Sequence, residues 1–171
     1  MSRSIKSAIA ALAVAALACG AAGARTSDRN KPMDIEAGHQ VCDLGDNATC
    51  TFTGKTTITQ GTLRIDAEKA VIVQAGGEPS RARFSGGVTL HQQMDDGTDL
   101  DAKSASVDYD LRTEIVVFTG DVTITQQRGT LRGERVVYNM KTGQIESGGA
   151  GNGRVRMQIL PKGGSAAKDG G

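Results

Sequence analysis

This chain of 171 residues carries the stretch Phe118-Thr-Gly-Asp-Val-Thr-Ile-Thr-Gln-Gln127 in three versions. The two earlier copies read Phe52-Thr-Gly-Lys-Thr-Thr-Ile-Thr-Gln60 and Phe84-Ser-Gly-Gly-Val-Thr-Leu-His-Gln-Gln93. Their phenylalanines are the only three in the chain, and they are 32 and then 34 residues apart. A fixed period of this length is typical of repeat architectures, in which each unit buries its apolar face against its neighbours.

Within each copy, apolar and polar residues alternate along the chain. Val122 and Ile124 fall on one face of an extended strand, while the threonines between and after them fall on the other. No segment keeps apolar residues at the helical spacing i, i+3, i+4, i+7 over the length of a helix. The sequence therefore predicts an all-β fold, a solenoid-like stack of short antiparallel strands, about four to each repeat, in two sheets folded over each other.

A pair of residues that begins with glycine interrupts each of these alternating runs: Gly54-Lys55, Gly86-Gly87 and Gly120-Asp121. A glycine at the first central position of a two-residue loop fits a type II′ hairpin. The Phe-Thr-Gly step therefore fits either a hairpin or a corner within one bent strand. The choice decides the face that each phenylalanine takes, and the sequence leaves it open.

Composition and motifs exclude several classes of function. The formal net charge is +1 and charged residues make up 23% of the chain, so we expect no nucleic-acid partner. The sequence has no P-loop, no Gly-x-Ser-x-Gly and no His-Glu-x-x-His motif. A carbohydrate-active enzyme would need a pair of carboxylates in a cleft, and the sequence supports no such pair. We therefore expect a protein that is not an enzyme and that holds no cofactor and no metal.

The first 24 residues read as a cleavable signal peptide. Arg3 and Lys6 form a charged start, residues 9–17 form an apolar run, and Ala22-Gly-Ala24 offers a small-residue cleavage site. A membrane anchor is the alternative, but the run is mostly alanine and ends in glycines. We expect an exported protein.

The rest of the chain divides into a mobile leader at 25–34, a β domain at 35–161 and a disordered tail at 162–171. Cys42 and Cys50 are the two cysteines that remain after cleavage. In an oxidising compartment a structural disulfide between them is expected, because a metal site would need more ligands than lie near this pair.

One face of each strand should point into the stack. The residues assigned to this interior are Ile58, Leu63, Ile65, Val71, Val73, Val88, Leu90, Val122, Ile124, Leu131, Val137, Val155, Met157 and Ile159. They are aliphatic and of middling size. Such a lining suits an ordinary packed core, and it equally suits a slot kept open for an apolar ligand.

Several features occur together in this chain: the three copies of Phe-(Thr/Ser)-Gly-x-(Val/Thr)-Thr-(Ile/Leu)-x-Gln, the Gly76-Gly77-Glu78 hairpin, the Val107-Asp-Tyr109 segment and the Arg154-Val155 end strand. Together they resemble the LptA (OstA-like) family of periplasmic lipopolysaccharide-transport proteins of Gram-negative bacteria. The resemblance covers roughly residues 33–161.

The resemblance implies a twisted β-jellyroll, open along one side, whose apolar lining binds the lipid A acyl chains of lipopolysaccharide on the way from the inner to the outer membrane. It also implies an LptC-like partner at the N-terminal edge (about 34–51) and an LptD-like N-terminal domain at the C-terminal edge (about 153–160). Head-to-tail self-association is a further expectation. Two alternatives stay open: an LptC-like relative anchored in the inner membrane, and a structural β-solenoid with a filled core.

Overall fold

The structure, a computed structural model, describes residues 26–148 and 154–161. The expected signal peptide at 1–24 and the expected tail at 162–171 lie outside the described residues. Within them, a short 3-10 turn, η1 (Thr26–Asn30), precedes ten β-strands, and no described segment is an α-helix. The described part of the chain contains no helix that is long and apolar enough to span a bilayer. The predicted all-β class is confirmed.

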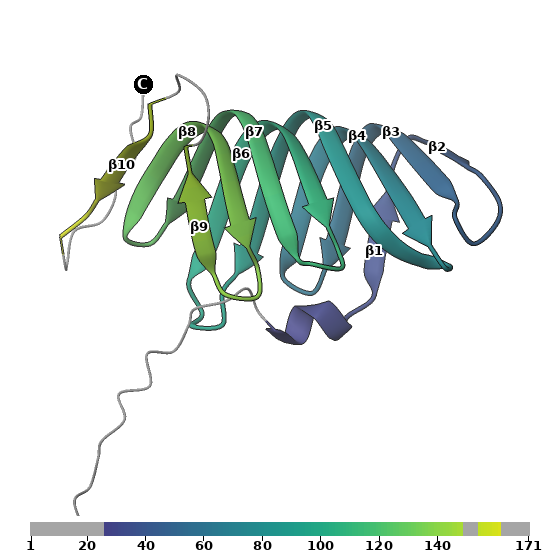
Figure 1. Cartoon of the computed structure of the whole chain (residues 1–171), viewed down its shortest axis with the longest axis horizontal. Helices are drawn as coiled ribbons and strands as arrows, with labels where there is room; N and C mark the ends of the chain where they lie inside the picture. Colours follow the sequence, from purple (N-terminus) through teal and green to yellow (C-terminus); the bar gives the residue numbers. More distant parts are fainter. Residues whose placement is uncertain (1–25, 149–153, 162–171) are drawn as a thin grey trace, which may run out of the picture.

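All strand pairings are antiparallel and join into one sheet in the order β1-β3-β4-β5-β6-β7-β8-β10, with β2 also paired to β3 and β9 to β8. Figure 1 shows them as bent ribbons stacked along the long axis, with β1 and β2 toward one end and β9 and β10 at the other. The strands are β1 (Met33–Glu36), β2 (His39–Cys42), β3 (Thr49–Gln60), β4 (Leu63–Ala75), β5 (Glu78–Gln93), β6 (Asp99–Asp110), β7 (Ile115–Gln126), β8 (Gly129–Asn139), β9 (Gln144–Ser147) and β10 (Arg156–Ile159).

Each long strand bends once in its middle, where the pairing register shifts. In β3 the pairing skips Gly54-Lys55, in β5 Gly86-Gly87 and in β7 Gly120-Asp121, and all six residues have positive φ. The Phe-Thr-Gly step is therefore a corner in one bent strand. Each repeat contributes two long bent strands, and the expectation of about four short strands per repeat is corrected.

The bends divide the sheet into two arms whose inner faces meet. Arm A consists of residues 39–42, 49–53, 69–75, 78–85, 106–110, 115–119, 135–139 and 144–147. Arm B consists of residues 33–36, 56–60, 63–67, 88–93, 99–104, 122–126, 129–133 and 156–159. The corners join the arms along one edge, and turns close each arm separately along the opposite edge, which we call the open edge.

Corners differ between strands that run from arm A to arm B and strands that return. The outgoing strands β3, β5 and β7 place two residues at the corner, whereas the returning strands β4, β6 and β8 place one, Glu68, Ala105 or Glu134. A single extra residue shifts the alternation of side chains by one position. In β4, Leu63 and Ile65 are buried before the corner, and after it the buried residues are Ala70 and Ile72.

This shift corrects three expected interior residues. Val71, Val73 and Val137 follow the single-residue corners of β4 and β8, so they lie on the outer face of arm A, half-buried. Their neighbours Ala70, Ile72, Val136 and Tyr138 take the buried positions. All three phenylalanines are buried in the core, which settles the face that the sequence left open.

Cys42 and Cys50 form the expected disulfide, with an S–S distance of 2.05 Å. They lie directly opposite each other on β2 and β3. The bond therefore ties the outermost strand of arm A to the first long strand.

Two of the corner glycines, Gly86 and Gly120, make room for the single corner residue of the preceding strand. A Cβ on Gly120, where φ is 80°, would lie 2.7 Å from the Cβ of Ala105. We expect Gly120→Ala to lower the free energy of unfolding by about 2–4 kcal/mol, because left-handed strain and overpacking add. Gly54→Ala is the matched control: φ is 78° there, but the new Cβ would meet nothing closer than 3.5 Å.

Urea unfolding of both variants measures the difference. The double variant Gly120→Ala/Ala105→Gly should lose less stability than the sum of its single changes, because it removes the overlap between the two Cβ atoms. Equal losses for Gly54→Ala and Gly120→Ala would contradict the proposed contact.

Candidate functional site

Side chains fill the middle of the space between the arms. Phe84, Phe118 and Tyr138 are each no more than 3% exposed there. The Tyr138 hydroxyl on arm A donates to the sulfur of Met94 on the open edge of arm B, at 3.6 Å. The two arms are thus in direct contact near the open edge, and empty space lies elsewhere.

A cavity of about 610 Å³ opens at the C-terminal end, between β9 on arm A and the strands β7, β8 and β10 on arm B. Its apolar lining is Ile124, Leu131, Ile145, Met157 and Ile159. Its volume falls within the range of about 300–1,000 Å³ that is usual for ligand pockets. Met157 and Ile159 are 66% and 70% exposed, because β10 is the last strand of arm B.

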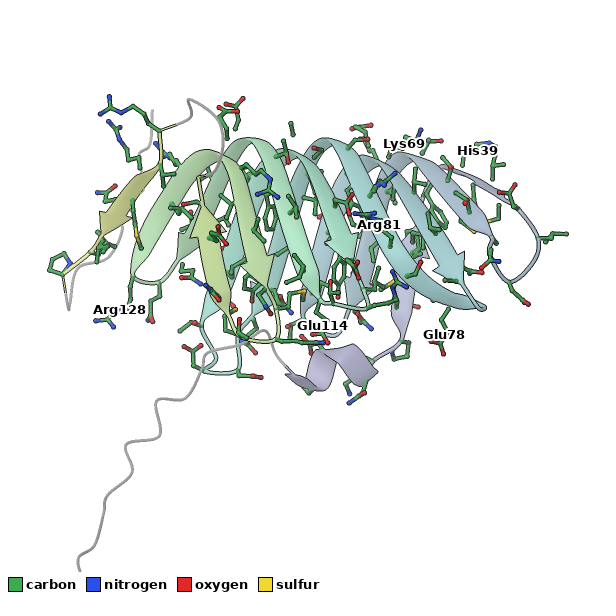
Figure 2. The ribbon with its side chains drawn as sticks, in the orientation of Figure 1. His39, Lys69, Glu78, Arg81, Glu114 and Arg128 are labelled. Carbon is green, nitrogen blue, oxygen red and sulfur yellow. A yellow bond between two sulfur atoms is a disulfide. The ribbon has the colours of Figure 1, made fainter. Side chains whose placement is uncertain are left out.

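The lining of this cavity also has polar members. Arg128 and Gln126 contribute to it from the turn between β7 and β8 and from the end of β7. Figure 2 shows Arg128 at the lower edge near the C-terminal end of the stack. An apolar pocket with one guanidinium in its wall suits an amphipathic ligand with an anionic head group.

A second cavity, of about 430 Å³, lies at the open edge near the N-terminal half. Met33 and Gln60 line it from arm B, and Tyr109 and Leu111 line it from the other side. Glu78 and Glu114 are also in its wall, and both are labelled along the lower edge in Figure 2. Its acidic lining distinguishes it from the C-terminal cavity.

Only part of the expected lining comes together around the empty space. Ile124, Leu131, Met157 and Ile159 line the C-terminal cavity, and Val155 lies beside that end, 42% exposed. The remaining expected residues that face inward are buried in the packed interior of arm B: Ile58, Leu63, Ile65, Val88, Leu90 and Val122. Val71, Val73 and Val137 are outside. Sequence reasoning missed Ile145, Gln126 and Arg128. Ile145 lies beyond the repeated stretches, and Gln126 and Arg128 are polar, whereas only apolar residues were assigned to the interior.

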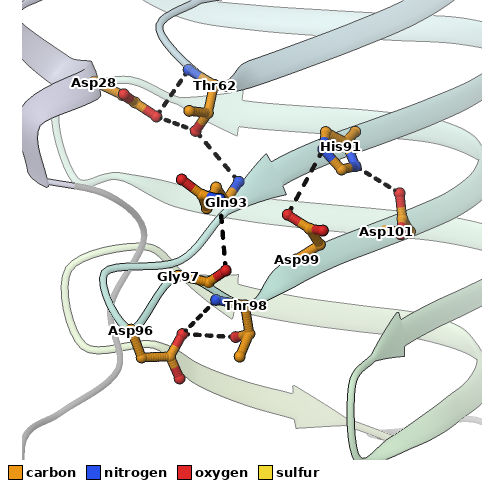
Figure 3. Close-up of polar contacts among 9 residues, drawn as sticks. All are labelled: Asp28, Thr62, His91, Gln93, Asp96, Gly97, Thr98, Asp99 and Asp101. Atoms are coloured by element: carbon orange, nitrogen blue, oxygen red, sulfur yellow. Dashed lines mark hydrogen bonds and ion pairs between the residues drawn. The ribbon is translucent and has the colours of Figure 1, made fainter. Parts of the chain in front are cut away.

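Residues 26–34, expected as part of a mobile leader, contact the domain. Asp28 is 6% exposed, and its carboxylate accepts hydrogen bonds from the Thr62 hydroxyl and from the Thr62 N–H at 3.0 Å. Thr62 in turn accepts a hydrogen bond from the Gln93 N–H at 3.2 Å (Figure 3). β1 begins at Met33, so the β domain starts two residues before the expected boundary. The segment is therefore fixed to the turn of arm B that contains Thr62, and Thr62 is itself bonded to Gln93 in the neighbouring turn.

Carboxyl groups with a lowered pKa lie outside the two cavities. Hydrogen bonds from the Thr98 hydroxyl and N–H hold the pKa of Asp96 below its ordinary value. The Thr113 N–H does the same for the pKa of Asp110. Because each pKa is lower in the folded state, these bonds stabilise the fold at neutral pH and are lost as the pH falls. No group of three potential metal ligands occurs in the described part of the chain.

Comparison with known proteins gives the site a context. The family model described as "LptA/(LptD N-terminal domain) LPS transport protein" matches residues 34–144. The lipopolysaccharide export system protein LptA of Haemophilus influenzae is 33% identical over 154 residues, which cover 88% of this chain and 89% of the relative. LptA of Escherichia coli K12 is 30% identical over 139 residues, covering 80% and 75%.

Among solved structures, the chain is similar to LptH, described as the LptA homologous periplasmic component of the lipopolysaccharide transport device of Pseudomonas aeruginosa. The TM-score is 0.72, and the match covers 79% of this chain and 99% of the other. The sequences are 21% identical, so this likeness supports the fold.

The hydrogen bonds between Asp28 and Thr62 anchor the N-terminal segment, and this anchor can be tested by comparison with Asp96. Both aspartates accept hydrogen bonds from the hydroxyl and the N–H of one threonine. Asp28→Ala leaves the Thr62 N–H without its acceptor in a nearly buried place, and we expect a loss of about 1–3 kcal/mol of unfolding free energy. Amide hydrogen exchange at Thr62 should accelerate by the corresponding factor. Asp96→Ala, the control in an exposed turn, should cost less than Asp28→Ala, because water replaces the lost bonds there, and should leave the Thr62 exchange rate unchanged. An unchanged Thr62 exchange rate in Asp28→Ala would contradict the anchor.

Proposed function

The chain belongs to the LptA/LptD N-terminal-domain family of lipopolysaccharide transport proteins, and from this premise we propose that it binds lipopolysaccharide in the periplasm by covering lipid A acyl chains between its two arms. Because the matching relatives are named as transport components, we propose a carrier rather than an enzyme. The carrier stands between the inner and outer membranes, with the sugars and phosphates of the lipid left in water.

The observation that supports this proposal most is the apolar cavity of about 610 Å³ that is open at the C-terminal end. Each CH₂ group brought into water costs about 0.8 kcal/mol, so an acyl chain of about 12 carbons costs on the order of 10 kcal/mol. Ile124, Leu131 and Ile145 offer such a chain an apolar wall. Arg128 at the same cavity is a suitable partner for a lipid phosphate.

Photo-crosslinking tests the proposal with a matched pair of positions. A photoreactive amino acid at Ile124 faces the cavity, whereas one at Val137 stands on the outer face of arm A. We expect lipopolysaccharide to be captured at Ile124 and not at Val137 in cells, read as a lipid-bearing band on a gel. Silence at Ile124 and also at Met157 would instead favour a structural β-solenoid with a filled core.

The ends of both arms are suited to strand addition. β1 and β2 end the stack on one side, and β9 and β10 end it on the other, so each leaves backbone donors and acceptors for another chain. We propose that an LptC-like protein docks on the N-terminal edge, and an LptD-like domain or a second copy on the C-terminal edge. Each arm has eight strand segments, so a second copy placed head to tail continues the antiparallel alternation.

Side chains at the two edges of arm B are complementary. Following the pairing register across the sheet, Glu36 and Arg156 stand on one outer row. Ile35 and Met157 stand on one inner row in the same way. A second copy that continues the rows therefore places Arg156 against Glu36 and Met157 against Ile35, with charges paired outside and apolar groups inside.

A charge exchange tests this register. Glu36→Arg or Arg156→Glu alone places like charges together and should weaken self-association severalfold, since a partly exposed pair contributes up to about 1 kcal/mol. The double exchange should restore it. Sedimentation velocity over a range of concentrations measures the effect, with Lys103→Glu, on the same outer row but in the middle of arm B, as control. A double exchange no better than either single change would refute the register.

A further inference from the structure

Each copy of the repeated stretch carries a glutamine at the same place, near the end of its strand on arm B. These are Gln60, Gln92 and Gln126. Gln60 pairs with Leu63, and Gln92 and Gln126 pair with Leu100 from its two sides. Gln92 follows His91, the partner of Arg64, and so takes the place opposite Leu63. The three glutamines therefore lie on one inner row of arm B, on every second strand.

Gln92 is the member of this row that is closed off from solvent. It is 1% exposed, and its Oε1 atom has no hydrogen-bond partner. The residues beside it on the row, Leu63 and Leu100, are apolar and also buried. A buried acceptor left without a donor is unfavourable, and folded proteins keep few of them. A methionine or leucine would fit the same apolar surroundings. Packing alone therefore does not explain why an amide stands at this position.

The glutamine row lies between the two cavities. Gln60 lines the cavity at the open edge, and Gln126 lines the cavity at the C-terminal end. Gln92 is two strands from each, about 10 Å away at the usual strand spacing. The rows further inside, toward the corners, are the apolar rows of Leu90 and Val88. The glutamines thus alternate with leucines on the paired inner row of arm B that lies nearest the open edge.

We infer that Gln92 is a ligand-binding residue, whose Oε1 accepts a hydrogen bond from a hydroxyl or amide N–H carried near the polar end of an acyl chain. The inference rests on the proposed function and adds a preference to it. An amphipathic lipid with its head outside the open edge and its hydrocarbon inside places such a donor at the depth of the glutamine row. A plain hydrocarbon chain leaves the acceptor unpaired, and a site built for a hydrogen bond discriminates against a ligand that lacks it.

Access to Gln92 requires that one contact between the arms opens. Met94, two residues further along the same strand end, meets Tyr138 of arm A across the interior. Methionine side chains are flexible and adapt to new neighbours. An acyl chain that enters from the C-terminal cavity and parts Met94 from Tyr138 reaches the glutamine row.

Two fatty acids that differ by one hydroxyl test the inference: 3-hydroxytetradecanoic acid and tetradecanoic acid. Binding of each to the full chain is measured by displacement of a fluorescent fatty acid. We expect the wild type to prefer the hydroxylated chain about tenfold, which corresponds to 1.4 kcal/mol. Gln92→Met keeps the volume and removes the acceptor, so the preference should fall to about one while affinity for the plain chain is retained.

Leu100→Met, on the same row and equally buried, is the control and should keep the tenfold preference. Gln92→Asn keeps an amide but withdraws it by one methylene, and it should lose the preference as well; thermal unfolding verifies that each variant is folded. Equal affinity of the wild type for the two acids, or a preference that survives in Gln92→Met, overturns the role of Gln92 and leaves the proposed function standing. Failure of the wild type to bind either acid overturns both.

Discussion

The structure depends on an unequal corner. Outgoing strands turn with two residues and returning strands turn with one, so each pair of strands bends together without losing its hydrogen bonds on either side. The arrangement requires a residue without a side chain where a single corner residue presses against the next strand. Ala105 presses on Gly120, and Glu68 presses on Gly86, where an added Cβ would lie 2.5 Å from the Glu68 Cβ. Because glycine allows this close approach, each strand passes from one arm to the other through a tight corner, and no loop is needed between two separate sheets.

Folding one sheet over itself creates an interior that is closed in the middle and incomplete at its ends. Tyr138 and Met94 join the arms near the open edge, while the last segments, β9 and β10, are only four residues each. Nothing in the described part of the chain covers Met157 and Ile159 from beyond β10. Space for a ligand and edges for a partner therefore occur at the same end of the molecule, which suits the proposed passage of lipid to a neighbour.

Much of this could be predicted from the sequence. The repeat and its alternation predicted an all-β fold, the resemblance of the quoted motifs to known sequences predicted the family, and the Cys42–Cys50 pair was predicted from its compartment. Buried residues of arm B such as Ile58 and Leu90 follow from alternation within one straight segment. Val137 was misplaced because its face depends on the number of residues at a corner, which alternation alone does not count. The cavity beside Arg128 is completed by β9 and β10, which lie beyond the repeats, so no internal comparison of the copies could reveal it.

One repeat adds two strands to each arm, and this even number has an evolutionary consequence. Duplication of a unit of 32 to 34 residues lengthens the molecule by about 10 Å at the usual strand spacing, and both terminal edges keep their polarity and their side chains. Loss of a unit shortens it by the same step. A gene built this way can match its span to the width of a cell envelope by copying whole modules, without redesigning either end.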